Sequence, residues 1–334
     1  MKKAVKMSDI ARRMGVSTVT VSKALGGKDG VSDALRELVS EKAAEMGYVY
    51  NCLPRNMRAG RRYLIGILIS TRYLGESSFY WFFYQTLLAQ LKETSYLGVL
   101  EIVSVEEEEK CVFPPFVVMN RVDGLIILGQ MAERYIAAIA SRIKNCIFLD
   151  FYSETDGYDC VVSNNFLGSY NLTKLLVAAG HTRIGFIGST SATTSILDRY
   201  MGFCKAMLEA SLPYDAAIED RDGNGVYTEI KLQPGAYTAY VCNNDQIAGI
   251  VITRLRELNL EVPRDVSIAG FDNESEAVTA GVGVTSLEVN VQDMCGTAVN
   301  LLIERIESKS YRLRGRLFID GRVVIKESIA APVQ

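Results

Sequence analysis

The chain has 334 residues, of which 49% are hydrophobic and 22% charged, and these proportions are typical of a globular protein with two or three domains. No charge-free apolar run reaches the roughly 18 residues of a membrane span, and the basic start MKKAVKMSDIARRMG lacks the apolar run of a secretory signal. The seven cysteines are scattered without a CxxC pair, which favours reduced thiols in a cytoplasmic protein.

Charge is distributed unevenly along the chain. Residues 1–62 hold thirteen basic and six acidic residues, whereas the remainder holds 23 basic and 33 acidic residues. A basic N-terminal module on an acidic body concentrates the attraction for phosphate in one place. A solvated basic face could explain part of this excess, but the helical pattern of the same segment favours binding to nucleic acid.

The stretch VKMSDIARRMGVSTVTVSKAL, residues 5–25, has the pattern of two short helices joined by a tight turn. Ser8 and Ser17 are suitable N-caps, and Gly15 can take the left-handed conformation that ends a helix. The apolar positions expected to face inward are Ile10, Ala11, Met14, Val21, Ala24 and Leu25.

The outward face of the second helix is short, polar and cationic, which suits a DNA major groove. Lys23 can donate to guanine or phosphate, and Thr18 and Val19 can contact base edges or a thymine methyl group. The pattern alone does not separate this from an ordinary helical hairpin with a solvated face. The expected DNA-binding residues of this helix are Thr18, Val19, Thr20, Ser22 and Lys23.

A third helix is expected to start at Ser32 and Asp33 and to end at Gly47. Its apolar stripe is expected to hold Leu35, Leu38, Val39 and Met46. The following segment, YVYNCLPRNMRAGRR at residues 48–62, is too short and too polar to bury a core and carries four arginines in its second half. Taken alone, it is equally consistent with a plain basic linker.

From Tyr63 onward, short apolar runs alternate with amphipathic stretches, which predicts parallel sheets with helices on their faces. The expected strands are 64–69, 99–105, 124–128, 146–150, 160–163, 183–188, 239–242 and 267–271. The expected helices lie near 80–94, 133–142, 166–179, 199–210, 245–258 and 293–306. In such sheets, ligands bind outside the carboxyl ends of the strands.

Polar side chains follow several of these predicted strand ends. Asp150 and Asp272 lie at the ends of two strands, and Asn244 follows a third. Arg199 is expected to begin a helix soon after a fourth strand. Each residue alone is most simply a helix cap or a loop ion pair, but together they supply acceptors and a bidentate cation for a polyhydroxyl ligand.

Several of these motifs are similar to those of a known family. SDIARRMGVSTVTVSKAL and GVSDALRELVSEKAAEMGYVYN resemble the helix-turn-helix and third helix of the LacI/GalR family of bacterial transcriptional regulators. VDGLIIL, AAGHTRIGFIG, DRYMGF, CNNDQIAG and VPRDVSIAGFDN resemble the motifs of its effector domain. The resemblance implies an α/β fold: an N-terminal all-α helix-turn-helix headpiece and a two-lobed periplasmic-binding-protein-like effector domain with Rossmann-like parallel sheets.

The same resemblance implies the domain organisation. Residues 1–62 would form the DNA-binding headpiece and hinge, and residues 63–334 the effector-binding and dimerisation domain. The lobe near the headpiece would hold about 63–162 and 290–319, and the far lobe about 163–289 and 320–334.

The resemblance also implies hinge residues that contact DNA, namely Asn51, Arg55 and Met57. In the family, the hinge folds into a helix when it pairs with its dimer mate on DNA. Met57 stands where the family usually has Leu, the apolar wedge that enters the minor groove. Pro54 stands where Ala is common, and proline is tolerated in a first helical turn.

For the effector, which is a sugar or in some members a purine, the motif match singles out Arg199 and Asp272, followed by Asp150 and Asn244. Phe79 and Tyr80 open the aromatic run 79–84 and resemble the pocket-lining segment of the family, although core packing is the alternative. Asn164 stands where the family usually has Asp.

We therefore expect a sequence-specific DNA-binding regulator, most simply a repressor, that is controlled by a sugar and works as a cytoplasmic, nucleoid-associated homodimer on a palindromic operator. The alternative is a solute-binding protein of a transport system, and an enzyme is a third possibility. The chain ends without a leucine heptad, so we do not expect a tetramer built on a C-terminal coiled coil.

We expect no catalytic residues, metal site, cofactor or membrane partner. His181, the single histidine, lies in a turn motif and is expected to be structural. No GxSxG elbow or P-loop occurs in the sequence. The run Glu106–Glu109 is expected to be a solvated helix start.

Overall fold

The computed structural model describes residues 5–48, 61–73, 79–155, 157–222, 225–275 and 279–333. The chain divides into two compact units, Met1–Tyr63 and Leu64–Gln334.

The first unit is a three-helix domain. Its helices are α1 (Met7–Met14), α2 (Thr18–Leu25) and α3 (Asp33–Glu45). The predicted N-cap Ser8 is wrong, because α1 begins one turn earlier and the amide of Lys6 donates to Asp9 Oδ2 at 2.9 Å. The other two expectations are confirmed: Gly15 ends α1 with φ +67°, and Ser17 Oγ accepts the Thr20 amide at 3.0 Å.

The core of this unit forms where the three helices meet. Ile10, Val21 and Val39 are fully buried, one from each helix. The prediction for Leu38 is wrong, since its side chain is 55% exposed. The inner stripe of α3 runs through Leu35, Val39 and Ala43 at four-residue spacing, which turns Leu38 toward solvent.

The second unit contains two sheets, and each forms the centre of one lobe. The first sheet is parallel throughout, with strand order β10-β5-β4-β3-β1-β2, and the second has the order β11-β9-β8-β7-β6, in which only the β11–β9 pair is antiparallel. The first holds β1 (Leu64–Ser70), β2 (Leu97–Val103), β3 (Gly124–Leu128), β4 (Cys146–Leu149), β5 (Asp159–Ser163) and β10 (Arg316–Ile319). The second holds β6 (Ile184–Ile187), β7 (Ala239–Cys242), β8 (Ser267–Phe271), β9 (Thr285–Glu288) and β11 (Arg322–Val324).

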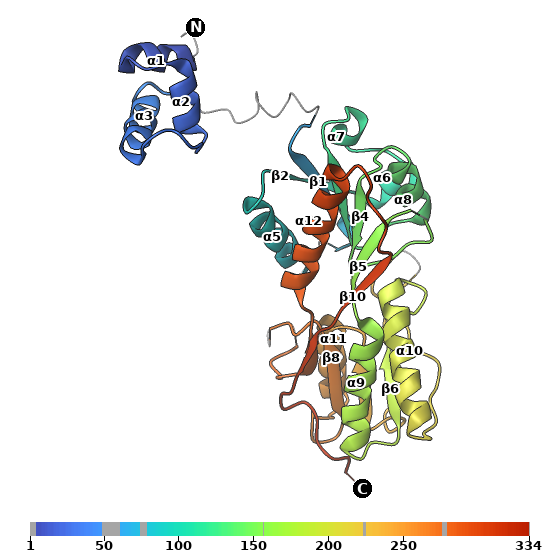
Figure 1. The fold of residues 1–334 in the computed structure, drawn as a ribbon. Coiled ribbons are helices and arrows are strands. Elements are labelled where there is room, and N and C mark those ends of the chain that lie inside the picture. Colours follow the sequence, from blue (N-terminus) through green and yellow to red (C-terminus); the bar gives the residue numbers. More distant parts are fainter. Residues whose placement is uncertain are drawn as a thin grey trace. The chain divides into compact units, whose positions relative to one another are not determined.

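Helices cover both sheets. In the first lobe, α12 packs against β3, β4, β5 and α5; in the second, α9 and α11 pack on the sheet and α10 lies along α9 (Figure 1). The helices of this unit are α5 (Phe79–Lys92), α6 (Val105–Glu109), α7 (Pro115–Val118), α8 (Glu133–Ala140), α9 (Asn165–Ala178), α10 (Thr194–Glu209), α11 (Asp245–Glu257), α12 (Val291–Glu307) and the 3-10 turn η2 (Thr71–Tyr73).

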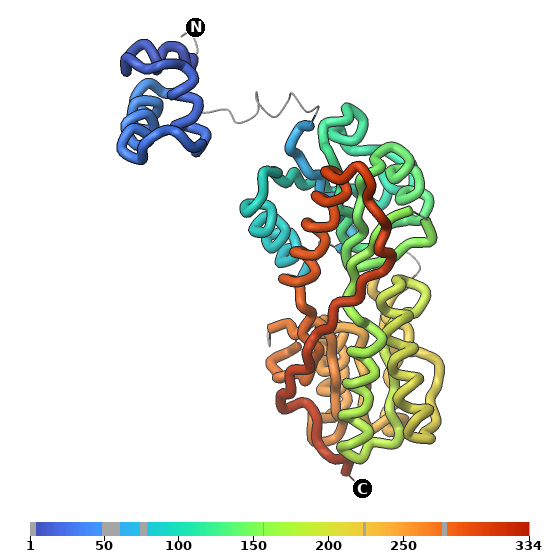
Figure 2. The backbone as a smooth tube through the Cα atoms, in the orientation of Figure 1, coloured from blue at the N-terminus to red at the C-terminus, as the bar shows by residue number. Residues whose placement is uncertain are grey.

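The chain passes between the two lobes three times within the described residues: after β5, after β9 and after β10. The last pass can be followed in Figure 2 as the red tube that carries β10 into β11. The carboxyl ends of strands from both sheets therefore face the region between the lobes, which is where ligands bind in open parallel sheets.

Most elements lie where the sequence pattern predicts them, with shifts of one to two residues. The placement of Arg199 at a helix start is wrong: Thr193 caps α10 by accepting the Ile196 amide at 3.2 Å, so the helix begins at Thr194. Arg199 is therefore in the second turn, inside the domain rather than at its rim.

Candidate functional site

The outward face of α2 carries four of the five residues predicted to bind DNA in ways that leave side chains accessible. Thr18 is exposed and Val19 is 64% exposed, while Ser22 and Lys23 are half-buried. Thr20 differs, because its Oγ1 lies 2.8 Å from Ser17 Oγ and takes part in the helix cap. A polar, cationic helix face of this kind suits a major groove.

The predicted hinge contacts Asn51, Arg55 and Met57 lie outside the described residues, as does Pro54.

A cavity of about 440 Å³ lies between the two lobes, at the carboxyl ends of their strands. Every predicted effector residue lines it: Phe79, Tyr80, Asp150, Arg199, Asn244 and Asp272. We call this cavity the cleft.

Asp150 and Asp272 enter the cleft from opposite lobes, directly after β4 and β8. Both have left-handed backbones, with φ +67° at Asp150 and φ +98° at Asp272. For a residue other than glycine such a conformation costs on the order of 1–3 kcal/mol and concentrates at functional sites. The backbone at both strand ends is thus held in a strained form that aims a carboxylate at the cleft.

Arg199 is the most firmly held of the cleft residues. Its Nε donates to Asn165 Oδ1 at 2.8 Å, its Nη1 donates to the Asn243 carbonyl, and its guanidinium lies 3.7 Å from the centre of the Phe271 ring. Nη2 lies 3.8 Å from Asp272 Oδ1, which is an ion pair rather than a hydrogen bond.

The two carboxylates are under-supplied with donors. Tyr80 donates its hydroxyl to Asp150 Oδ2 at 2.8 Å, while Asp150 Oδ1 and Asp272 Oδ1 find no hydrogen-bond donor in the described part of the chain. Burial raises the pKa of Asp150 to about 6 and that of Asp272 to about 7. A buried acceptor without a donor is costly, so a ligand that brings hydroxyl donors is favoured here.

The remaining predicted residues have mixed surroundings. Tyr80 packs 4.8 Å from Tyr73, centre to centre, and burial raises its pKa, so its hydroxyl stays a donor. Phe79 lies edge-on to Tyr80 at 5.3 Å. Asn244 Oδ1 accepts the Ile247 amide at 2.9 Å, so this residue caps α11 as well as lining the cleft.

Sequence reasoning missed several cleft residues, among them Arg72, Tyr73, Gln130, Arg221 and Tyr227. Arg72, Tyr73 and Gln130 closely follow β1 and β3, so the strand-end rule could have identified them. Arg221 and Tyr227 lie in irregular chain, where the sequence gives no comparable signal.

Each of the three arginines that line the cleft within the described residues has a carboxylate partner. Arg199 pairs with Asp272, Arg221 donates to Asp220 at 2.7 Å, and Arg72 pairs with Glu108 at 3.1 Å. The cleft therefore offers neutralised guanidinium groups beside unsatisfied carboxylate oxygens.

Glu108 corrects the expectation of a solvated helix start. Its side chain is fully buried, accepts the Ala132 amide at 2.9 Å and contacts the Ser70 hydroxyl as well as Arg72. It links the ends of β1 and β3, so it positions the wall of the cleft.

His181 is confirmed as a structural residue. It is buried, with Nδ1 2.9 Å from Thr238 Oγ1 and Nε2 2.9 Å from the Ala330 carbonyl. Within residues 5–333, apart from the undescribed gaps, no group of His, Cys, Asp and Glu could hold a metal ion. No helix in the described part of the chain is long and apolar enough to cross a membrane.

Comparison with known proteins agrees with this arrangement. Residues 6–51 match the family described as bacterial regulatory proteins, lacI family, and residues 173–329 match a periplasmic binding protein-like domain. The HTH-type transcriptional regulator RegA of Clostridium saccharobutylicum is 29% identical over 323 residues, which cover 92% of this chain and 94% of RegA.

Two solved structures have a similar fold. The lac repressor dimer bound to operator and the anti-inducer ONPF has a TM-score of 0.75 and 22% identity, covering 98% of this chain and 100% of its own. The complex of the transcriptional regulator CelR with cellobiose has a TM-score of 0.68 and 22% identity, covering 97% and 99%.

A helix-turn-helix headpiece joined to a two-lobed domain with a polar cleft defines a DNA-binding transcriptional regulator with a ligand-binding effector domain. The chain belongs to the lacI family of bacterial regulatory proteins.

Proposed function

We propose that this protein is a transcriptional repressor that binds a palindromic operator as a homodimer and releases or tightens on it when a sugar occupies the cleft. The observation that carries the effector half of this proposal is the pair of carboxylate oxygens, on Asp150 and Asp272, that lack donors among the described residues beside the buried Arg199.

A sugar fits this arrangement for chemical reasons. Its hydroxyl groups donate to carboxylates and accept from guanidinium groups, and its apolar face can pack on rings such as Phe79 and Tyr80. The solved CelR complex, which holds cellobiose, supports the same class of ligand.

The ligand that the cleft favours is uncharged. A phosphorylated sugar would need an unpaired cation, whereas Arg72, Arg199 and Arg221 are each paired with a carboxylate. Glu109 and Glu133 also line the cleft and add negative charge. We therefore place sugar phosphates below neutral sugars in affinity.

Dimerisation is supported by exposed apolar side chains on one edge of the first sheet. Strand β2 is an edge strand, and Leu97 and Ile102 on it are 64% and 42% exposed. Trp81 on the neighbouring α5 is 41% exposed. Such an apolar edge is an aggregation hazard in a monomer and suits an interface between two copies.

A dimer also accounts for DNA specificity. One recognition helix covers too few base pairs to select a site, and two related by a two-fold axis read a palindrome. The hinge residues Asn51, Arg55 and Met57 would contact the minor groove between the half-sites. The protein would act in the cytoplasm, bound to the nucleoid.

Coupling between effector and operator would run through the lobes. A sugar that contacts Asp150 and Asp272 joins the two lobes, and the three passes between them allow closure about a common axis. Closure would change the dimer interface of the first lobe and thereby the ability of the hinges to pair on DNA.

The rival function is a solute-binding protein of a transport system, which would share the cleft. The basic helix-turn-helix is unexplained by that function, and so is its match to the lacI family. Enzymatic activity has even less support, because no nucleophile–base arrangement occurs among the cleft residues that the structure describes.

The test is selection of bound duplexes from a random DNA library, with the full-length protein and with a variant lacking residues 1–62. Enrichment of a palindrome by the full-length protein alone would support the proposal and supply the operator for a sugar screen. Enrichment by neither protein, with and without pooled sugars and purines, would contradict it.

A further inference from the structure

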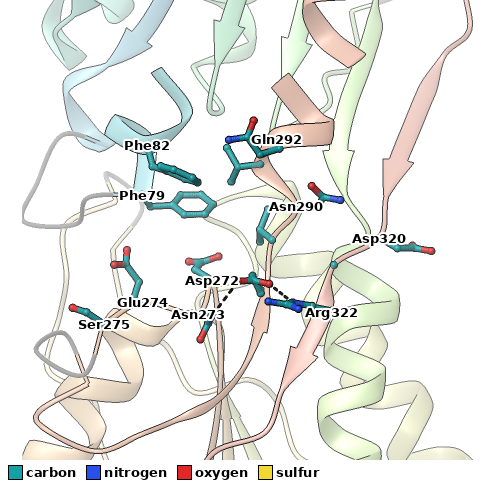
Figure 3. A pocket seen from close by; sticks show the side chains of 14 residues that line it. Phe79, Phe82, Asp272, Asn273, Glu274, Ser275, Asn290, Gln292, Asp320 and Arg322 are labelled. Atoms are coloured by element: carbon teal, nitrogen blue, oxygen red, sulfur yellow. Dashed lines mark hydrogen bonds and ion pairs between the residues drawn. The ribbon is translucent and has the colours of Figure 1, made fainter. Parts of the chain in front are cut away.

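A second cavity, of about 690 Å³, lies beside the passes between the lobes (Figure 3). Its walls include Asn290 before α12 and Asp320 between β10 and β11. It shares only Phe79 and Asp272 with the lining of the cleft, as far as the described residues show. We call it the hinge pocket.

The hinge pocket is strongly acidic. Four carboxylates line it, on Asp272, Glu274, Glu288 and Asp320, against one guanidinium, that of Arg322, within the described part of the chain. Arg322 is consumed by an ion pair with Glu288, drawn as a dashed line in Figure 3. The pocket therefore carries excess negative charge even after its own cation is counted.

One of these carboxylates is buried and short of donors. The Asp272 side chain is 9% exposed, and its Oδ1 accepts no hydrogen bond from any described residue; the nearest cation, Arg199, lies 3.8 Å away. The neighbouring Asn273 also has an Oδ1 for which the described residues supply no donor, although its amide nitrogen donates to Glu288 at 3.3 Å. The floor of the pocket thus presents acceptor oxygens that require an external donor.

The opposite wall is aromatic. Phe79 and Phe82 extend from the first turn of α5 in the first lobe, and Figure 3 shows their rings across the pocket from Asp272 and Glu274. Phe82 is 48% exposed, so its ring is not needed for the core. Ring faces opposite carboxylates are the surroundings that hold an ammonium group, because the rings and the carboxylates both attract positive charge.

The N-terminus of α12 also borders this pocket and, by its dipole, would attract an anion. That helix end is already occupied, however. Asn290 Oδ1 accepts the Asp293 amide at 3.2 Å, and the Asp293 carboxylate lies in the first turn. The charge balance of the pocket therefore stays with its four carboxylates.

We propose that the hinge pocket is a binding site for an organic ammonium ion, separate from the sugar site in the cleft. The ammonium group would lie between the Phe79 and Phe82 rings and the carboxylates of Asp272 and Glu274, in contact with both lobes. Such a ligand would bridge the lobes at their hinge, so it would influence the same closure as the sugar.

The experiment is calorimetric titration of the full-length protein, free of DNA, with benzyltrimethylammonium, a monocation with an apolar body. We expect saturable binding of one ion per chain. Glu274→Gln should weaken it about threefold or more, because one carboxylate is removed. Phe82→Leu, which keeps apolar volume and removes the ring, should weaken it about two- to fivefold.

Matched controls separate a site from diffuse attraction to an acidic domain. Glu257→Gln removes an exposed carboxylate on α11, and Phe166→Leu removes an exposed ring on α9; both should leave the affinity unchanged. Equal weakening by the controls, equal binding of the uncharged benzyl alcohol, or no saturable binding would overturn the proposal. Sugar and operator titrations of the same variants report on the proposed function independently, since Glu274 and Phe82 are not among the cleft residues.

Discussion

Arg199 and Asp272 face each other across 3.8 Å, close enough for an ion pair and too far for a hydrogen bond. Arg199 is at the same time fixed by Asn165 and by the Phe271 ring, so it cannot simply move closer. The pair is therefore held open by its surroundings. A ligand hydroxyl that donates to Asp272 and accepts from Arg199 would complete it.

Replacing Arg199 tests this arrangement. We expect Arg199→Ala to weaken sugar binding about 100-fold or more, because charge-assisted hydrogen bonds of ~1.5–3 kcal/mol each are lost. Operator binding should persist. The measurement is calorimetric titration with the sugar found by the screen, beside fluorescence anisotropy with operator DNA.

The matched control is Arg254→Ala, which removes an exposed arginine paired with Glu229 and Glu257 on the surface. It should leave sugar affinity unchanged. Unchanged sugar affinity in Arg199→Ala, with the fold intact by circular dichroism, would remove Arg199 from the effector site.

Asp150 predicts a trade between stability and binding. Burial raises its pKa from 3.8 to about 6, so the folded protein without ligand is penalised wherever this carboxyl is ionised. Asp150→Asn should therefore raise the free energy of unfolding at pH 8 by up to about 3 kcal/mol, from 1.36 kcal/mol per pKa unit. Below pH 3.8 both states hold the proton and the gain should vanish; it should grow as pH rises through about 6.

Denaturant unfolding of the wild type and Asp150→Asn at pH 4 and pH 8 measures this effect. Sugar affinity should fall in the variant at pH 8, because an amide is a poorer acceptor than a carboxylate. An equal stability change at both pH values would show that the ionised carboxylate is not the cause.

The recognition helix makes its own prediction. Lys23→Ala should weaken operator binding, and if Lys23 contacts phosphate the slope of log K against log salt should fall by about one. If it contacts a base, specificity should relax at one position of the half-site. Lys42→Ala on α3, which removes a surface pair with Glu45, is the control and should change neither.

The two compact units should fail independently. Ile10 is fully buried in the three-helix core, so Ile10→Ala should destabilise that unit by about 2–5 kcal/mol and abolish operator binding. Sugar affinity should remain, since no residue of the cleft belongs to that unit as described. Differential scanning calorimetry and sugar titration together check this. Loss of sugar binding would show that the units do not fold separately.

How far the sequence leads depends on burial. The central strands of both sheets were predictable, because parallel strands buried on both faces form continuous apolar runs such as GLIIL at β3. The strands β10 and β11 were missed, since they are short edge strands with alternating exposure and carry Arg316 and Arg322. Edge strands lack the signal that burial imposes.

The site divides in the same way. Asp150, Asn244 and Asp272 were predictable because the end of a parallel strand fixes where the next residue points. The helix register of Arg199 and the burial of Glu108 were not, because both depend on partners distant in sequence: Asn165 for the first and Arg72 for the second. The hinge pocket also has no local signal, since its walls come from both lobes.

The account claims that the cleft and the operator-binding face are coupled, and linkage tests this directly. The measurement is the dissociation constant of the sugar for the full-length protein, alone and saturated with operator, beside that of the operator with and without saturating sugar. We predict that the two ratios are equal and differ from one by about 5- to 150-fold. Two ratios of one, with both ligands binding, would contradict the claim that this protein is a sugar-controlled regulator.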